Sequence, residues 1–341
     1  MSADVVDRFP QPVAHWFRSS FQRPTSVQAA AWEEISAGRN ALVVAPTGSG
    51  KTLAAFLWSL GQLCRPRSEG TSVQDSASEQ GVRVVYVSPL KALGVDVDNN
   101  LRAPLKGIAL AAEKLGVDVA SVTVGVRSGD TSQAERARQV RRPPDILITT
   151  PESLYLLLTS KGGRMLRTVD TLIIDEVHAV AGTKRGAHLA LSLERLEELK
   201  AEAGGSRIQR IGLSATVPNT GELAGWLRSV RGKTELVHSA VRPVPLRQEV
   251  AVGRKVFRLF GKDGGPLGAL VSAIAKLPPD GRGRVSDRDR RRIIDLLAER
   301  DMLPAIEFIF SRKGCDKAVE ALLQRDVALT GRKERAEAAA R

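Results

Sequence analysis

Cysteine is scarce in this chain of 341 residues, which contains only Cys64 and Cys315. The two fall in different expected elements, and neither has the Cys or His spacing of a metal site. This argues against both a framework of disulfide bonds and a structural zinc site. Long apolar runs are also lacking, so no stretch is expected to cross a bilayer and no membrane partner is expected.

The N-terminus lacks the features of an export signal. MSADVVDRFPQPVAHWF has neither a basic start nor a hydrophobic segment followed by small residues. We therefore expect a cytoplasmic protein. With 43% hydrophobic and 26% charged residues, the chain has the composition of a folded protein, long enough for one large domain and part of another.

Positive charge is concentrated in the C-terminal part of the chain. The net charge is +13; residues 1–200 hold 24 basic against 21 acidic residues, and residues 201–341 hold 27 against 17. A basic surface attracts a polyanion such as DNA or RNA, because binding releases counterions. An ordinary solvated, arginine-rich surface has the same composition, so charge supports a nucleic-acid partner without deciding it.

Short apolar runs alternate with helical patterns through the first 240 residues. The expected strands are Ala41–Val44, Val82–Val87, Val119–Val126, Asp145–Ile148, Thr171–Ile174 and Ile208–Leu213. The expected helices are Thr52–Leu63, Leu101–Leu115, Pro151–Leu158 and Ala187–Lys200. Apolar strands joined by helices are typical of a parallel sheet covered on both faces, so the fold class is α/β.

A change in composition near residue 241 marks a boundary, because Arg242-Pro243-Val244-Pro245 favours an extended exit from the first domain. The expected domains are residues 1–240, an interdomain segment at 241–300, and the start of an incomplete second α/β lobe at 301–341. The C-terminal expectations are a helix at Asp287–Arg300, a strand at Ala305–Phe310 and a helix at Asp316–Gln324. Residues 65–81, which have no large apolar side chains, are expected to form a surface loop.

The strongest chemical motif is a phosphate-binding loop, Ala45-Pro46-Thr47-Gly48-Ser49-Gly50-Lys51-Thr52, between an expected strand and an expected helix. Gly48 and Gly50 let the backbone curl so that N–H groups face phosphate oxygens. Lys51 has the position to reach the β- and γ-phosphates, and Thr52 to ligate Mg²⁺. Ala45 stands where a first glycine is usual. The context disfavours a chance glycine-rich turn, so we expect ATP and Mg²⁺ as cofactors.

A second motif, Asp175-Glu176-Val177-His178, follows the expected strand Thr171–Ile174. Ligands of open α/β sheets bind beyond such strand ends. Phosphoryl transfer to water needs a carboxylate to hold Mg²⁺, here Asp175, and a base for the water, here Glu176. An acidic pair after a strand also caps helices, and His178 also suits a core histidine; the upstream phosphate loop favours the catalytic interpretation.

These two motifs and Ser214-Ala215-Thr216 occur in the order of the superfamily 2 DExH helicases, which the chain resembles. VAPTGSGKTLAAFLW and PDILITTPESLYLLLTS make the first 200 or so residues most similar to the large helicase-related (Lhr) proteins. From about Arg207, LSATVPNTGELAGWL and LPAIEFIFSRKGCDKAVEALL look closer to the Ski-type RNA helicases. The resemblance implies a RecA-like ATP-binding lobe and an ATP-dependent DNA or RNA helicase.

The resemblance also implies roles for single residues. Gln28 matches a glutamine that recognises adenine, although a lone glutamine on a helix is usually solvated. Ser214, Ala215 and Thr216 would couple the ATP site to the second lobe, with His178 as a partner. Contacts to nucleic-acid phosphates are implied at Ser88, Pro89, Lys91, Gly129, Asp130, Thr149, Thr150, Pro151, Glu152, Ser311 and Arg312. Helix capping is the alternative for these junction residues, and it is compatible with phosphate contact.

No later motif supplies the arginines that such enzymes direct at the γ-phosphate, so we expect the chain to be a fragment that hydrolyses ATP slowly and unwinds nothing. One alternative is a nucleotide-dependent nucleic-acid-binding module without unwinding activity. Another is a different phosphate-loop ATPase, such as a transporter motor or a kinase. The Ser214–Thr216 motif, Gln28 and the TTPES segment count against the latter.

Overall fold

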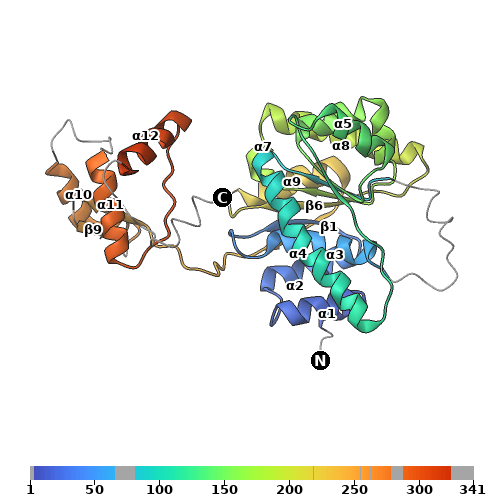
Figure 1. The fold of residues 1–341 in the computed structure, drawn as a ribbon, viewed down its shortest axis with the longest axis horizontal. Coiled ribbons are helices and arrows are strands. Elements are labelled where there is room, and N and C mark those ends of the chain that lie inside the picture. The colour runs from blue at the N-terminus through green and yellow to red at the C-terminus, as the bar shows by residue number, and fades with distance from the viewer. Residues whose placement is uncertain are drawn as a thin grey trace. The chain divides into compact units, whose positions relative to one another are not determined.

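A computed structural model describes residues 4–65, 81–217, 219–253, 255–261, 263–277 and 287–323. Except for its two end residues, the expected surface loop at 65–81 lies outside these ranges, as does the chain beyond residue 323. The chain forms two compact units, Met1–Val244 (unit 1) and Pro245–Arg341 (unit 2) (Figure 1). The predicted roles of these parts as helicase lobes stay predictions.

Unit 1 contains a seven-stranded sheet in the order β3-β4-β2-β5-β6-β1-β7, and every pairing is parallel. The strands are β1 (Asn40–Val44), β2 (Val84–Val87), β3 (Val124–Arg127), β4 (Ile146–Thr149), β5 (Thr171–Ile174), β6 (Gln209–Ser214) and β7 (Thr234–His238). The predicted α/β class and parallel sheet are confirmed. Strand β7, which lies at the sheet edge and has the sequence Thr-Glu-Leu-Val-His, was not predicted.

Helices cover both faces of this sheet. They are α1 (Gln11–Ser20), α2 (Ser26–Ser36), α3 (Lys51–Leu63), α4 (Lys91–Leu115), α5 (Gln133–Arg141), α6 (Pro151–Leu158), α7 (Val177–Val180), α8 (Lys184–Glu202) and α9 (Thr220–Arg231), with 3₁₀ turns η1 (Val5–Arg8) and η2 (Lys161–Leu166). Figure 1 shows α1, α2 and α3 on one side of the sheet and α5 and α8 on the other. Successive strand residues enter opposite layers, since Val43 packs with α1–α4 and Leu42 packs with α6–α9.

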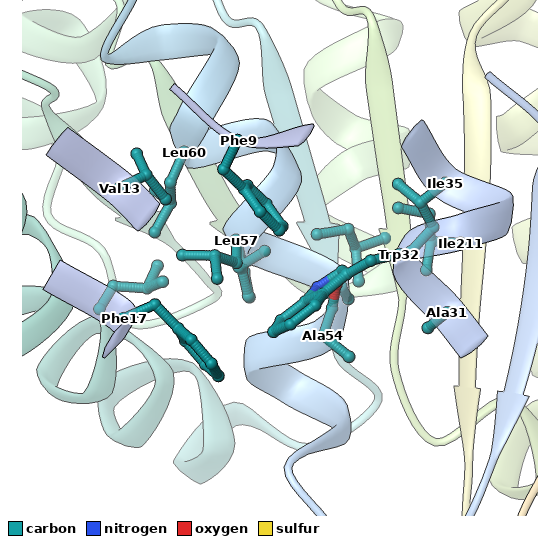
Figure 2. Packing of buried hydrophobic residues seen from close by; sticks show 14 of the residues in the cluster. Phe9, Val13, Phe17, Ala31, Trp32, Ile35, Ala54, Leu57, Leu60 and Ile211 are labelled. Atoms are coloured by element: carbon teal, nitrogen blue, oxygen red, sulfur yellow. The ribbon is translucent and has the colours of Figure 1, made fainter. Parts of the chain in front are cut away.

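Trp32 of α2 anchors the packing between the N-terminal helices and the phosphate-loop helix α3. Its ring meets Phe9 edge-on at 5.0 Å and Phe17 at 5.2 Å (Figure 2). Its indole Nε1 donates to the carbonyl of Ala54 in α3 at 3.0 Å. Because the ring is fully buried and its single polar group is satisfied, α2 is held against α3. This contact brings Gln28, one turn earlier on α2, to the phosphate loop.

The described residues of unit 2 form a two-stranded antiparallel sheet and three helices. They are β8 (Glu249–Val252), β9 (Lys255–Arg258), α10 (Gly268–Ala275), α11 (Asp287–Glu299) and α12 (Arg312–Leu323). The predicted strand at Ala305–Phe310 is wrong: within the described ranges this segment has no β-partner, and Phe308 and Phe310 are exposed. The apolar residues of this segment favour a strand, but a strand requires a neighbour to hydrogen-bond with.

Candidate nucleotide and nucleic-acid site

The phosphate loop leaves the end of β1, which lies between β6 and β7, and leads into α3. Gly48 and Gly50 have positive φ angles of 82° and 85°. The positive φ of Gly50 favours glycine, and a Cβ there would also crowd the side-chain amide of Gln28. The turn therefore leaves the N-terminal end of α3 open to an anion.

Lys51 is held inside the loop by two backbone carbonyls. Its Nζ donates to the oxygen of Ala45 at 2.7 Å and to that of Pro46 at 3.2 Å. Burial lowers the pKa of this amine, while Glu176 and Asp175 oppose the shift. The hydroxyl of Ser49 is buried and has no hydrogen-bond partner among the described residues. The loop thus carries a cationic amine and an unsatisfied hydroxyl, and its glycines give its backbone the curled conformation that binds phosphate.

Gln28 is not the solvated glutamine that a helix surface usually carries, because its side chain is only 5% exposed. Its Oε1 accepts from the N–H of Thr25 at 3.0 Å, and its Nε2 donates to the carbonyl of Gly50 at 3.4 Å. Thr25 completes the contact by donating its hydroxyl to the carbonyl of Ser49 at 3.0 Å. The α2 cap and the phosphate loop therefore form one structure. The predicted recognition of adenine by Gln28 stays a prediction.

The carboxylate of Asp175 lies at the end of β5 and is held from two sides. Its Oδ1 accepts from the N–H of Glu176 at 2.9 Å, and its Oδ2 accepts from the phenol of Tyr86 on β2. Its own N–H donates to the carbonyl of Val87 at 2.9 Å, which continues the β2–β5 pairing. Two fixed oxygens with lone pairs to spare are suited to hold a hard cation.

Glu176 occupies the left-handed backbone region, with φ 47°. A residue with a Cβ pays about 1–2 kcal/mol there, and such strain concentrates at functional sites. Oε2 of Glu176 lies 3.2 Å from Nδ1 of His178, and the same nitrogen lies 3.2 Å from Oγ of Ser214. Burial, followed by the nearby charge of Asp175, raises the pKa of Glu176. These side chains link β5 to β6 beside the phosphate loop.

All motifs lie along the carboxyl edge of the sheet, because the strands are parallel and end on the same side. Their order along this edge follows the order of the strands in the sheet. The motifs on β1, β5 and β6 form a nucleotide half. The segments after β2, β3 and β4, which carry most of the predicted nucleic-acid contacts, form a neighbouring half. The boundary lies between β2 and β5.

In this second half the structure shows capping, which was the alternative. Thr150 is the N-cap of α6, and its hydroxyl accepts from the N–H of Ser153. The hydroxyl of Thr149 donates to the carbonyl of Arg127 at 2.8 Å. Glu152 is paired with Arg185 of α8 at 2.9 Å. Phosphate contact stays a prediction for Thr149, Thr150, Pro151 and Glu152.

The other predicted nucleic-acid contacts lie at two more strand ends and in unit 2. Ser88 and Pro89 follow β2 and lead to Lys91, the first residue of α4, while Gly129 and Asp130 follow β3. The buried Ser88 donates its N–H to the carbonyl of Thr149 at 2.9 Å. In unit 2, Ser311 directly precedes α12, which begins at Arg312, and the hydroxyl of Ser311 accepts from the N–H of Gly314 at 2.9 Å. Ala215 and Thr216 follow β6 directly, with the hydroxyl of Ser214 donating to the carbonyl of Ala215 at 2.9 Å.

Tyr86 and Thr25 are two site residues that sequence reasoning missed. Tyr86 stands in the apolar run VVYV, where a phenol that is buried needs a hydrogen-bond partner. Thr25 precedes α2 with Gln28 three positions later, which is the spacing of a capping box. The sequence thus indicates that each side chain forms a hydrogen bond, but it does not identify the partners, which are Asp175 for Tyr86 and Ser49 for Thr25.

The described residues contain no group of three or more His, Cys, Asp or Glu side chains that could hold a metal ion. A Mg²⁺ bound through substrate phosphates needs only one or two protein ligands, so this finding agrees with the arrangement around Asp175. None of the described helices has the length and apolar character to span a membrane.

Residues 25–223 match the family model described as DEAD/DEAH box helicase. The chain is 52% identical over 250 residues to the Lhr helicase/probable uracil glycosylase of Mycolicibacterium smegmatis, and 50% identical over 251 residues to the Lhr helicase/uracil glycosylase of Escherichia coli. These matches cover 73% and 74% of this chain and 16% of each relative. The expected resemblance to the Lhr proteins is confirmed there; that of the C-terminal third to Ski-type helicases stays a prediction.

A solved structure of the Mycobacterium smegmatis helicase Lhr bound to ssDNA and AMP-PNP matches with a TM-score of 0.73 and 39% identity. The match covers 98% of this chain and 40% of that one. The chain therefore spans less than half the length of these relatives.

Proposed function

The chain belongs to the DEAD/DEAH box helicase family, and from this premise we propose that it binds and hydrolyses ATP and couples hydrolysis to movement along a DNA or RNA strand. The observation that carries the proposal is the carboxyl edge of the sheet. Lys51 after β1, Asp175 and Glu176 after β5, and Ser214 on β6 stand on adjacent strands. The segments with predicted nucleic-acid contacts follow the next strands along. This edge of the sheet thus supplies both a site for phosphoryl transfer and a predicted surface for binding a nucleic-acid strand.

Two further observations support this function. The Mycobacterium smegmatis Lhr structure contains ssDNA and AMP-PNP, an ATP analogue, and shares the fold over nearly all of this chain. The polar groups of the site have the donors and acceptors that a nucleotide triphosphate requires: loop N–H groups, an amine and a carboxylate.

The side chains at the phosphate loop fit Mg²⁺. The buried, unpartnered hydroxyl of Ser49 shows that the loop has hydrogen-bonding capacity to spare. The hydroxyl of Thr52 and the carboxylate of Asp175 are hard oxygen ligands, which this cation prefers, and they would hold it. When bound, Mg²⁺ neutralises charge on the phosphates during transfer.

Hydrolysis assigns each protein group one task. The N–H groups of the loop and Lys51 bind the β- and γ-phosphates. Glu176 accepts a proton from water as the water oxygen forms a bond to the γ-phosphorus. The bond between the γ-phosphorus and the β,γ-bridging oxygen breaks, and that oxygen leaves as part of ADP. His178, within 3.2 Å of both Glu176 and Ser214, joins the base to β6 and to the Ser214–Thr216 motif. That contact gives hydrolysis a route to the rest of the protein.

Steady-state ATP hydrolysis by the purified chain, with Mg²⁺ and with or without single-stranded DNA or RNA, tests this function. We expect measurable turnover that one of the nucleic acids stimulates and that Lys51→Ala and Glu176→Gln abolish. Lys51→Ala also removes nucleotide binding, whereas Glu176→Gln retains it, because only Lys51 contacts phosphate in the ground state. Turnover that survived both substitutions would falsify the site assignment.

A second candidate function is a nucleotide-dependent nucleic-acid-binding module without unwinding activity. The observation that favours it is unit 2, whose described residues contain only the antiparallel β8–β9 pair and no parallel sheet. ATP-dependent changes in nucleic-acid affinity without turnover in the same assay would select this alternative.

A further inference from the structure

We propose that Tyr86 is a positioning residue for the reaction: its phenol orients the carboxylate of Asp175 toward the metal-bound nucleotide. This inference rests on the proposed function, because it concerns the same site. The residue lies on β2, outside every motif that the sequence singled out, and contacts the nucleotide half across the β2–β5 boundary.

The hydrogen bonds of Asp175 leave its carboxylate with little freedom. One oxygen accepts from the backbone N–H of Glu176, which is part of the turn itself. The other accepts from the phenol of Tyr86, which is the only side chain among the described residues that donates to it. The phenol therefore fixes the rotation of the carboxylate about its last bond. Each oxygen keeps a lone pair for a cation or its bound water.

The ring of Tyr86 is itself held rigidly. It is fully buried and stacks on Phe56 of α3, with the ring centroids 5.1 Å apart and the planes inclined by 26°. Phe56 lies five residues after Lys51 on the helix that the phosphate loop begins. The ring is thus packed against the phosphate-loop helix while its hydroxyl holds Asp175. A donor supported in this way fixes the distance between the two motifs.

A purely structural role predicts something different. A buried phenol that only satisfies a neighbour contributes to folding, and its loss would lower the melting temperature without changing metal dependence. A positioning role acts on the oxygens that face the cation. Metal-dependent binding must then change more than stability does, and metal-free binding must stay the same.

The test compares Tyr86→Phe with wild type in the intact purified chain. Binding of a fluorescent ADP is measured in EDTA and at increasing Mg²⁺, and Mn²⁺ binding in the presence of ADP is followed by electron paramagnetic resonance. We expect unchanged ADP binding in EDTA and a metal affinity weakened by about 10-fold, the lower end of what losing such a supporting partner causes. In hydrolysis, kcat falls while the KM for ATP at saturating Mg²⁺ stays constant.

The chain offers a matched control. Tyr155→Phe removes the hydroxyl of the only other tyrosine, whose ring lies 4.6 Å from that of His188 at an angle of 58°, and should leave all of these values unchanged. A double variant adds a second criterion: in an Asp175→Asn background, Tyr86→Phe should have no further effect on Mn²⁺ binding, because it acts through Asp175.

Two results would overturn the inference. One is metal affinity in Tyr86→Phe equal to wild type; the other is a loss that persists undiminished in Asp175→Asn. Lys51→Ala separates this failure from that of the proposed function. If Lys51→Ala abolishes ADP binding while Tyr86→Phe behaves as wild type, only the positioning role is wrong. If Lys51→Ala binds ADP normally, the nucleotide site itself is wrong.

Discussion

The two units differ sharply in how many of their apolar side chains are buried. Unit 1 contains nearly all the buried hydrophobic residues of the described chain, whereas unit 2 contributes only Leu270 and Ala318. A parallel sheet with helices on both faces buries the residues of its central strands from both sides, and this gives unit 1 two continuous layers of core. A hairpin and three helices offer no such surface to pack on. The hydrophobic core of the described residues therefore belongs almost entirely to unit 1.

Single aromatic residues show the same contrast. Trp32 of unit 1 is completely buried and hydrogen-bonded, while Phe308 and Phe310 of unit 2 are 82% and 104% exposed. Burial of one aromatic side chain is among the largest single contributions to folding, and an exposed one contributes almost nothing. The following predictions use this difference, from the largest expected effect to the smallest.

Trp32→Ala should lower the free energy of unfolding by about 3–5 kcal/mol, because it leaves a cavity between α2 and α3 and removes the bond to Ala54. Phe310→Ala, the matched change in unit 2, should stay within about 0.5 kcal/mol of wild type. Denaturant unfolding followed by circular dichroism measures both values. Similar losses in the two variants would show that Phe310 is buried in solution and would erase the contrast.

The two cysteines should react very differently. Burial, together with the charge of Asp145, raises the pKa of the Cys64 thiol to about 11, so it carries very little of the reactive thiolate near neutral pH. Cys315 of unit 2 is exposed. An aromatic disulfide reagent should modify one thiol of the native chain rapidly and the second only in denaturant. With Cys315→Ser, no rapid reaction should remain; a rapid residual reaction would mean that α3 opens readily.

Glu152→Gln should have a small effect, although Glu152 is paired with Arg185. The hydrogen bond from Arg185 lowers the pKa of Glu152, so the pair stabilises the folded state above the ordinary pKa of a glutamate. That contribution disappears as the pH falls through the lowered value. Because both side chains are well exposed, we expect about 0.5 kcal/mol at neutral pH. Melting curves at neutral and acidic pH check this, and a difference that grew in acid would contradict it.

Ending the chain at Val244 should change least. Since unit 1 has its own core, its melting temperature should stay within about 2 °C of that of the whole chain, which corresponds to less than about 1 kcal/mol for a domain of this size. Calorimetry of the two proteins measures the shift. A much lower transition in the shorter chain would show that unit 2 supports unit 1.

The sequence predicted the parts of the fold that are set locally. Thr171–Ile174 and Pro151–Leu158 appear with the expected bounds, because an unbroken apolar run and a proline after a threonine cap are local signals. Strand β7 was missed because Thr-Glu-Leu-Val-His has neither a long apolar run nor strict alternation, and it is a strand through its pairing with β1. Ala305–Phe310 failed for the opposite reason: the pattern was present but no partner strand was.

The candidate site divides in the same way. The phosphate loop and the Asp175–Glu176 pair were readable because each motif is continuous in sequence. Tyr86 and the buried state of Gln28 were not, since both depend on contacts between elements far apart in the chain. The order of the strands in the sheet places the nucleotide half next to the half with predicted nucleic-acid contacts. This order depends on pairing between strands far apart in the sequence, so the motifs alone did not predict it.

The two carbonyls that hold Lys51 make nucleotide binding an exchange reaction rather than a simple addition. To reach a phosphate, the amine must give up its bonds to Ala45 and Pro46. The binding free energy of ATP then includes the difference between two hydrogen-bonded states of Lys51, one bonded to the loop carbonyls and one bonded to phosphate. A nucleoside, which has no phosphates, leaves Lys51 bonded to these carbonyls, so discrimination between nucleotides and nucleosides begins with the bonds that the protein already offers this side chain.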